Sequence, residues 1–150
     1  MIKYFCNYYQ RSGSTKKTIG FVFVIICVMC FLLCACSDNV ENVKIKQVTS
    51  EMYSQQDISM AIDALIEEFD SDWNNCTLNE LYYAGDKVTQ EHQEWAERYD
   101  ADEAIVLSSV FFVDRADSAA SMNAGTTYEW IWILVRTGDE NWTCVDYGFY

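Results

Sequence analysis

The chain has 150 residues and an acidic composition, with 23 Asp and Glu against 10 Lys and Arg. All 23 acidic residues follow Cys36, whereas only six basic residues do, so this part carries a formal charge of −17, compared with −13 for the whole chain. A negative charge of this size opposes binding to a phosphate backbone, which depends on Lys and Arg. We therefore expect no nucleic-acid partner.

The first 35 residues have the three parts of a secretory signal peptide. Four basic residues and no acidic residue lie before position 19, residues 19–35 carry no charge, and the small residue Ala35 precedes Cys36. A basic region, an apolar region and a small-residue cleavage site in this order predict export of the remaining chain.

The tetrapeptide LCAC at residues 33–36 resembles the lipobox of bacterial lipoproteins, in which leucine, a small residue and alanine or glycine precede an invariant cysteine. Cys34 departs from this pattern, because alanine, serine or threonine is more usual there. The resemblance implies that residues 1–35 are removed and that Cys36 is linked to a diacylglycerol. This lipid would anchor the protein to the outer face of the cell membrane.

An uncleaved membrane anchor is the alternative interpretation of the same segment. Residues 19–36 form a stretch of about 18 residues, the lower end of the length that spans a bilayer. The basic flank would then stay in the cytoplasm. Both interpretations place residues 37–150 outside the cytoplasm.

We expect residues 36–53 to comprise the lipidated cysteine and a tether, or one short strand within residues 37 to about 50, and residues 54–150 to form a single domain. Aromatic and β-branched residues are abundant in periodic runs, which disordered chains lack. About 100 ordered residues are enough to enclose one hydrophobic core.

The first predicted element of the domain is an amphipathic helix that begins after Ser54. Ser54 is a suitable N-cap, and Asp57 occupies the third helical position, as in a capping box. The apolar residues that follow recur at the helical period and define one buried face. They are Ile58, Ile62, Leu65, Ile66 and Phe69.

The rest of the domain alternates predicted strands with one further helix. Residues 76–84 are β-prone, and Thr89 is a candidate cap for a second, shorter helix with Val88, His92, Trp95 and Tyr99 on one side. The β-branched and aromatic runs at 103–114, 127–136 and 141–147 predict three further strands, the last two as a hairpin. This order predicts an α+β fold, with both helices packed on one face of a curved antiparallel sheet of about four strands.

Several runs along the domain carry a family resemblance. YSQQDISMAIDAL, CTLNELYYAGD, AIVLSSVFFVD, YEWIWILVR and NWTCVDYGF, in this order, resemble a family of small uncharacterised lipoproteins of Gram-positive gut bacteria. The chain is also similar in general to cystatin-like, nuclear-transport-factor-like domains, in which a helix lies in the concave side of a bent sheet. The resemblance covers about two thirds of the chain and implies a fold but no activity, since such folds host both enzymes and binding modules.

Two of the seven cysteines remain as candidates for a disulfide. Cleavage before Cys36 would remove four, and lipidation would use Cys36 itself, which leaves Cys76 and Cys144. A disulfide between them requires their two strands to be neighbours. The alternative is two buried thiols that act as small hydrophobic side chains.

The last two predicted strands carry an unusual number of aromatic residues. Tyr128, Trp130 and Trp132 alternate along one strand, and Trp142 and Tyr147 follow on the next. Such a stripe is core when a helix covers it, and a surface for a protein partner or a small apolar ligand when part of it is exposed. Our first functional hypothesis is therefore a non-catalytic domain that binds a protein partner or a small apolar ligand.

A small extracytoplasmic enzyme is the second hypothesis. His92 is the only histidine, and Tyr82 or Asp146 could assist it as a general base in a concave pocket. The chain has no nucleophile elbow and no glycine-rich phosphate loop, and no HxxxH or CxxC pattern follows Cys36. We therefore assign no catalytic residue, metal or cofactor.

Overall fold

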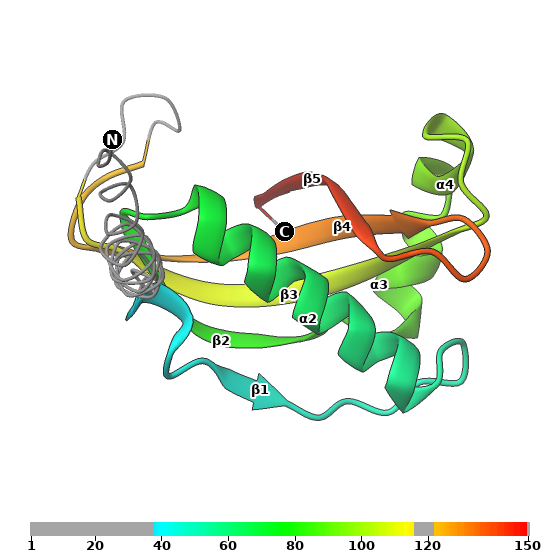
Figure 1. Ribbon diagram of the computed structural model, residues 1–150, viewed down its shortest axis with the longest axis horizontal. Helices are drawn as coiled ribbons and strands as arrows, with labels where there is room; N and C mark the ends of the chain where they lie inside the picture. Colours follow the sequence, from blue (N-terminus) through cyan, green and yellow to red (C-terminus); the bar gives the residue numbers. More distant parts are fainter. Residues whose placement is uncertain (1–37, 116–121, 150) are drawn as a thin grey trace, which may run out of the picture. The chain divides into compact units, whose positions relative to one another are not determined.

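The computed structural model describes residues 38–115 and 122–149 (Figure 1). The chain divides after Cys36 into two units, and the described residues belong to the second, residues 37–150. The predicted signal peptide and Cys36 therefore lie outside the described residues. Within the described part, no helix is both long and apolar enough to cross a membrane.

The described chain is an α+β domain built on an open five-stranded sheet. The sheet has the order β1 (Lys44–Lys46), β2 (Cys76–Tyr83), β3 (Glu103–Val113), β4 (Thr126–Arg136) and β5 (Thr143–Phe149). The helical elements are the short 3-10 helix η1 (Asp38–Val40), the long helix α2 (Gln55–Asp72), α3 (Asp86–Glu91) and α4 (Glu94–Arg98). The α+β class predicted from the sequence is confirmed.

The sheet is mixed, whereas the sequence predicted about four antiparallel strands. β2 to β5 pair antiparallel, but β1 adds a fifth strand that runs parallel to β2. The strand has only three residues and all three side chains are exposed, so no buried face marks it in the sequence. Lys44 and Lys46 form ion pairs with Glu80 on β2, which explains why a short segment in the predicted tether joins the edge.

Helix α2 begins where the sequence predicted, although η1 and β1 precede it. The Ser54 hydroxyl accepts a hydrogen bond from the Asp57 N–H at 3.1 Å, and the Asp57 carboxylate accepts one from the Ser54 N–H at 3.3 Å. This reciprocal pair satisfies two backbone donors that a helix start leaves free. The buried face packs on the sheet through Ile58, Ala61, Ile62, Leu65 and Phe69.

The predicted second helix is instead two short helices on the other face of the sheet. Thr89 is no cap, because its side chain is fully buried and its hydroxyl accepts a hydrogen bond from the Val106 N–H at 3.3 Å. Helix α3 begins earlier, after Gly85, whose φ of 99° suits glycine. Val88 on α3 packs against Val106, Ile131 and Ile133. The expectation that both helices share one face was therefore wrong.

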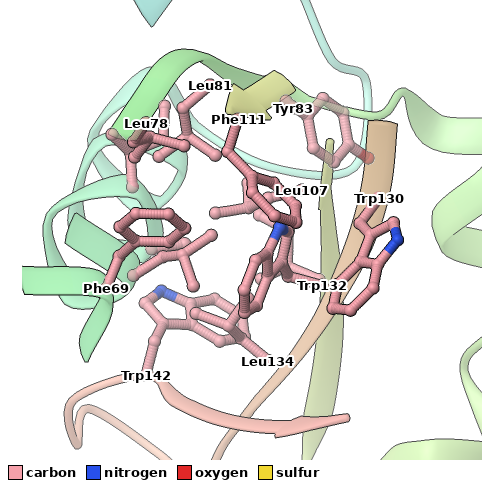
Figure 2. Close-up of a cluster of buried hydrophobic side chains, with 14 of the residues drawn as sticks. Phe69, Leu78, Leu81, Tyr83, Leu107, Phe111, Trp130, Trp132, Leu134 and Trp142 are labelled. Carbon is pink, nitrogen blue, oxygen red and sulfur yellow. The ribbon is translucent and has the colours of Figure 1, made fainter. Parts of the chain in front are cut away.

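Strand β4 carries the core on both of its sides. Trp130, Trp132 and Leu134 belong to the large cluster beneath α2, and Ile131 and Ile133 to the cluster beneath α3. Alternate residues of a strand point to opposite faces, so every side chain from Trp130 to Val135 is buried. Figure 2 shows Trp132 in the large cluster, near Leu107 and Leu134, with Trp130 at its margin.

Candidate functional site

The predicted aromatic face is mostly core. Trp132 is fully buried, Trp142 is 4% exposed, and Trp130 is 7% exposed, whereas Tyr128 is partly buried. The indole N–H of Trp132 donates a hydrogen bond to the hydroxyl of buried Ser109 at 2.7 Å. Helix α2 lies over these side chains, which is the outcome expected for an aromatic stripe beneath a helix.

The aromatic cluster reaches the surface at the end of β5. Tyr147 is 48% exposed and Phe149 is 72% exposed. Tyr147 stacks on Trp130 with ring centroids 5.6 Å apart and meets the edge of Trp73 at 5.1 Å, while Phe149 contacts Trp130 at 5.5 Å and Tyr128 at 6.0 Å. We call these five residues, Trp73, Tyr128, Trp130, Tyr147 and Phe149, the aromatic patch.

Sequence reasoning missed two members of this patch. Phe149 follows Tyr147 at the two-residue spacing of a strand face, and this spacing could have identified it. Trp73 is the C-cap of α2, where the helix stops covering the sheet. The point at which α2 ends therefore decides which aromatic side chains stay exposed.

A groove of about 720 Å³ lies between α2 and the start of β5. Four carboxylates line it on the side of α2, and we call it the acidic groove. They are Asp63, Glu67, Glu68 and Asp72. The other lining residues include Met60 and Ala64 on α2 and Trp142 and Cys144 near the start of β5. The side of the groove formed by α2 is therefore acidic, whereas the side near the start of β5 carries no charged residue.

No ion pair within the described residues neutralises these four carboxylates. Lys44 and Lys46 pair with Glu80, and Lys87 pairs with Glu91. Arg136 pairs with Asp57 and Glu103, and Arg98 lies over the ring of Trp95. These five cations, Lys44, Lys46, Lys87, Arg98 and Arg136, are therefore engaged away from the groove.

Burial alters the acid–base behaviour of two groups in the groove. Burial raises the pKa of Glu68 above its ordinary value, a hydrogen bond with Cys144 opposes this rise, and the charge of Asp72 adds to it. Burial, followed by the negative charge of Glu68, raises the pKa of the Cys144 thiol. Cys144 therefore remains a neutral thiol, whereas nucleophilic cysteines need a lowered pKa.

The structure does not join the candidate pair Cys76 and Cys144 in a disulfide. Cys76 lies on β2 and Cys144 on β5, with β3 and β4 between them. Cys76 is aligned with Val113 at one end of the sheet, and Cys144 is aligned with Leu134, whose partner on β3 is Ile105 near the other end. The condition that their strands be neighbours is therefore not met.

A smaller hollow, of about 240 Å³, contains two of the residues considered for catalysis. His92 and Asp146 both line it, together with Glu94 and Trp95. The Nδ1 of His92 lies 2.9 Å from the carbonyl of Val88, and because a carbonyl only accepts, Nδ1 carries the proton in this contact. Tyr82 is not in its lining and instead lies under the ammonium of Lys46 at 4.8 Å.

The described residues contain no group of three or more His, Cys, Asp or Glu side chains placed to hold a metal ion. No protein-family model, curated protein or solved structure matches the chain.

Proposed function

We propose that the protein is a lipoprotein, anchored through Cys36 to the outer face of the cell membrane, with a domain that acts as a non-catalytic binding module. The LCAC tetrapeptide and the change from a basic to an acidic chain at this point support the anchor. In this proposal residues 1–35 are the signal peptide, and residues 36–53, which contribute β1 to the sheet, carry the lipid and join it to the domain. A cystatin-like fold of the resembled lipoprotein family presents the binding surface.

The exposure of the aromatic patch carries the proposal for binding. Phe149 and Tyr147 expose large apolar rings on an edge strand, next to rings that are already packed. Aromatic residues are enriched where proteins bind partners, since each provides a large contact area with few rotatable bonds. The patch therefore suits a protein partner or a small apolar ligand.

Replacement of both exposed rings tests this proposal. The double variant Tyr147→Ser/Phe149→Ser removes the apolar contact area, so we expect it to lose the partner that the native protein retains on chemical cross-linking in native membranes. The variant Ile45→Ser/Met52→Ser is the control, since it removes apolar residues of 41% and 38% exposure from β1 and from the loop before α2. Equal cross-linking by both variants would contradict a role for the patch, provided that circular dichroism shows both to be folded.

The alternative function is a small extracytoplasmic enzyme that uses the hollow containing His92. The presence of His92 and Asp146 in one hollow favours it. No hydrogen bond joins these two side chains within the described residues, and Tyr82 lies elsewhere, so the general-base arrangement that this enzyme requires is incomplete. Binding therefore remains our proposed function.

A further inference from the structure

We propose that the acidic groove receives an extended segment of a partner protein that is rich in lysine or arginine, and that this segment adds as a strand to the outer edge of β5. The inference rests on the proposed binding function and specifies the chemistry of the partner. It adds a second surface, which adjoins the aromatic patch along β5.

Charge is the first argument for a basic segment. Asp63, Glu67, Glu68 and Asp72 face a single groove, and none of them has an ion pair within the described part of the chain. Burial already disfavours ionised Glu68. A ligand cation in the groove would supply the missing opposite charge, and electrostatic complementarity of this kind gives specificity and speeds association.

The spacing of the carboxylates is the second argument. Asp63 and Glu67 are four residues apart on α2, as are Glu68 and Asp72, and four residues correspond to about 6 Å along a helix axis. Alternate side chains of an extended strand lie on one side at intervals of about 6.7 Å. A segment with a basic residue at every second position therefore matches the carboxylates along the helix.

The free edge of β5 is the third argument. The sheet order ends at β5, so its outer edge pairs with no strand in the described residues. The strand contains no proline, lysine or arginine, which are the residues that commonly protect an edge from added strands. The Tyr99 hydroxyl donates a hydrogen bond to the Val145 carbonyl at 3.3 Å, and strand addition would replace this exposed contact with a backbone one.

The position of β5 beside α2 links the edge to the groove. Tyr147 meets Trp73 at the end of α2, and Cys144 lies with Glu68 in the groove lining. A strand added at this edge gains backbone hydrogen bonds from β5, while every second side chain points to the α2 side. One extended segment could therefore pair with the edge of β5 through its backbone and place its side chains in the acidic groove.

A second copy of this chain is a poor occupant of the groove. The part that follows Cys36 carries six basic and 23 acidic residues, so two copies repel each other. Strand β5 itself has Asp146 as its only charged residue and offers no cation to a facing groove. The occupant is therefore a basic segment of another protein.

The test measures the binding of a designed peptide to the detergent-solubilised full-length protein by titration calorimetry. The probe is a capped hexapeptide that alternates lysine with threonine. We expect Glu67→Gln/Glu68→Gln to weaken its binding about tenfold, as for the loss of two partly exposed charge pairs. The control Glu94→Gln/Glu97→Gln removes the same charge from α4, and we expect binding close to that of the native protein. Equal weakening by both variants would show that hexapeptide binding depends only on the net charge of the protein, and it would overturn the proposal.

Backbone pairing has its own test with the same protein. Two N-methylated versions of the hexapeptide block the N–H groups of either the lysines or the threonines. Successive N–H groups of a strand point to opposite edges, so we expect one version to lose binding and the other to keep it. Binding that neither version disturbs, or that spermidine matches at the same charge of three, would exclude strand addition.

The aromatic patch separates this inference from the proposed function. Tyr147→Ser/Phe149→Ser should leave the salt-sensitive part of hexapeptide binding in place, because the groove carboxylates remain. Loss of the cross-linked partner without loss of hexapeptide binding would support both proposals. If Glu67→Gln/Glu68→Gln leaves hexapeptide binding unchanged, the present inference is refuted, whereas the proposed function is not.

Discussion

At the scale of single residues, the acidic groove destabilises the ionised form of Glu68. Its carboxylate is half-buried on α2, near Asp72 and the thiol of Cys144. Burial favours the protonated form of a carboxyl group. The groove therefore makes ionised Glu68 less stable in the folded domain than in the unfolded chain.

This arrangement predicts a pH-dependent gain in stability for Glu68→Gln. The pKa of Glu68 is raised on folding, so the stability that it contributes is present below the unfolded pKa and is lost as the pH rises through the folded pKa. Glutamine does not ionise, and we expect the variant to be more stable at pH 7 by up to about 1 kcal/mol, after allowance for solvent screening.

Urea unfolding at pH 7 and at pH 4 measures this difference. The gain should shrink at the lower pH, where native Glu68 is protonated. Glu67→Gln is the control, because it removes the same charge from an exposed neighbour. A gain that is the same at both pH values would show that the effect does not come from ionisation.

At the scale of elements, Arg136 connects the end of β4 to two other elements. Its guanidinium lies 2.9 Å from the carboxylate of Asp57 in the first turn of α2 and 2.8 Å from that of Glu103 at the start of β3. It also lies over the ring of Trp142 at 4.3 Å. The hydrogen bond from Ser54, followed by that from Arg136, lowers the pKa of Asp57. One side chain thus fixes the start of α2 to the sheet.

We expect Arg136→Met to lower the free energy of unfolding by about 2 kcal/mol, because two partly buried carboxylates lose their cation. Arg136→Lys should recover only part of the loss, since an ammonium group cannot form the same planar contacts with two carboxylates and an indole ring. Chemical denaturation followed by far-ultraviolet circular dichroism measures both. Arg98→Met is the control, because Arg98 stacks on Trp95 on the other face of the sheet. Full stability of the lysine variant would contradict a need for the guanidinium.

Sequence reasoning succeeded for elements whose signals are local. The capping box of Ser54 and Asp57 and the spacing of Ile58 to Phe69 identified α2, because both depend on neighbours within the helix. Strand β1 was predicted only as an alternative to a tether, since its pairing depends on Glu80, more than 30 positions away. The second helix was misplaced because Thr89 looks like a cap but is buried against β3.

The candidate site was predicted only in part for the same reason. The aromatic stripe could be read from alternation along β4, but its exposed portion depends on where α2 ends and on how β5 aligns with β4. The acidic groove requires α2 and β5 to lie side by side, which no local pattern specifies. In the sequence alone, four carboxylates on one helix indicate a solvent-exposed face.

At the scale of the whole molecule, the proposed anchor predicts a defined N-terminus. Intact-mass analysis of the protein extracted from native membranes should give a chain that begins at Cys36 and carries a diacylglycerol. Two acyl chains anchor firmly, since each buried methylene contributes about 0.8 kcal/mol. Cys36→Ala should remain uncleaved and unmodified, whereas the control Cys34→Ala should be processed normally. Native protein that retains Met1 would refute the lipoprotein proposal and support the uncleaved anchor.

The distribution of the five tryptophans across the sheet gives the molecule an internal reporter of the aromatic patch. Trp73, Trp130, Trp132 and Trp142 lie in the cluster beneath α2, whereas Trp95 packs on the opposite face with Tyr99. Three of the four, Trp73, Trp130 and Trp132, contact the half-exposed Tyr147 directly. Because indole fluorescence responds to the polarity around the ring, an occupant of the patch would change the emission of these three tryptophans first. Intrinsic tryptophan fluorescence can therefore report binding at the aromatic patch without an added label.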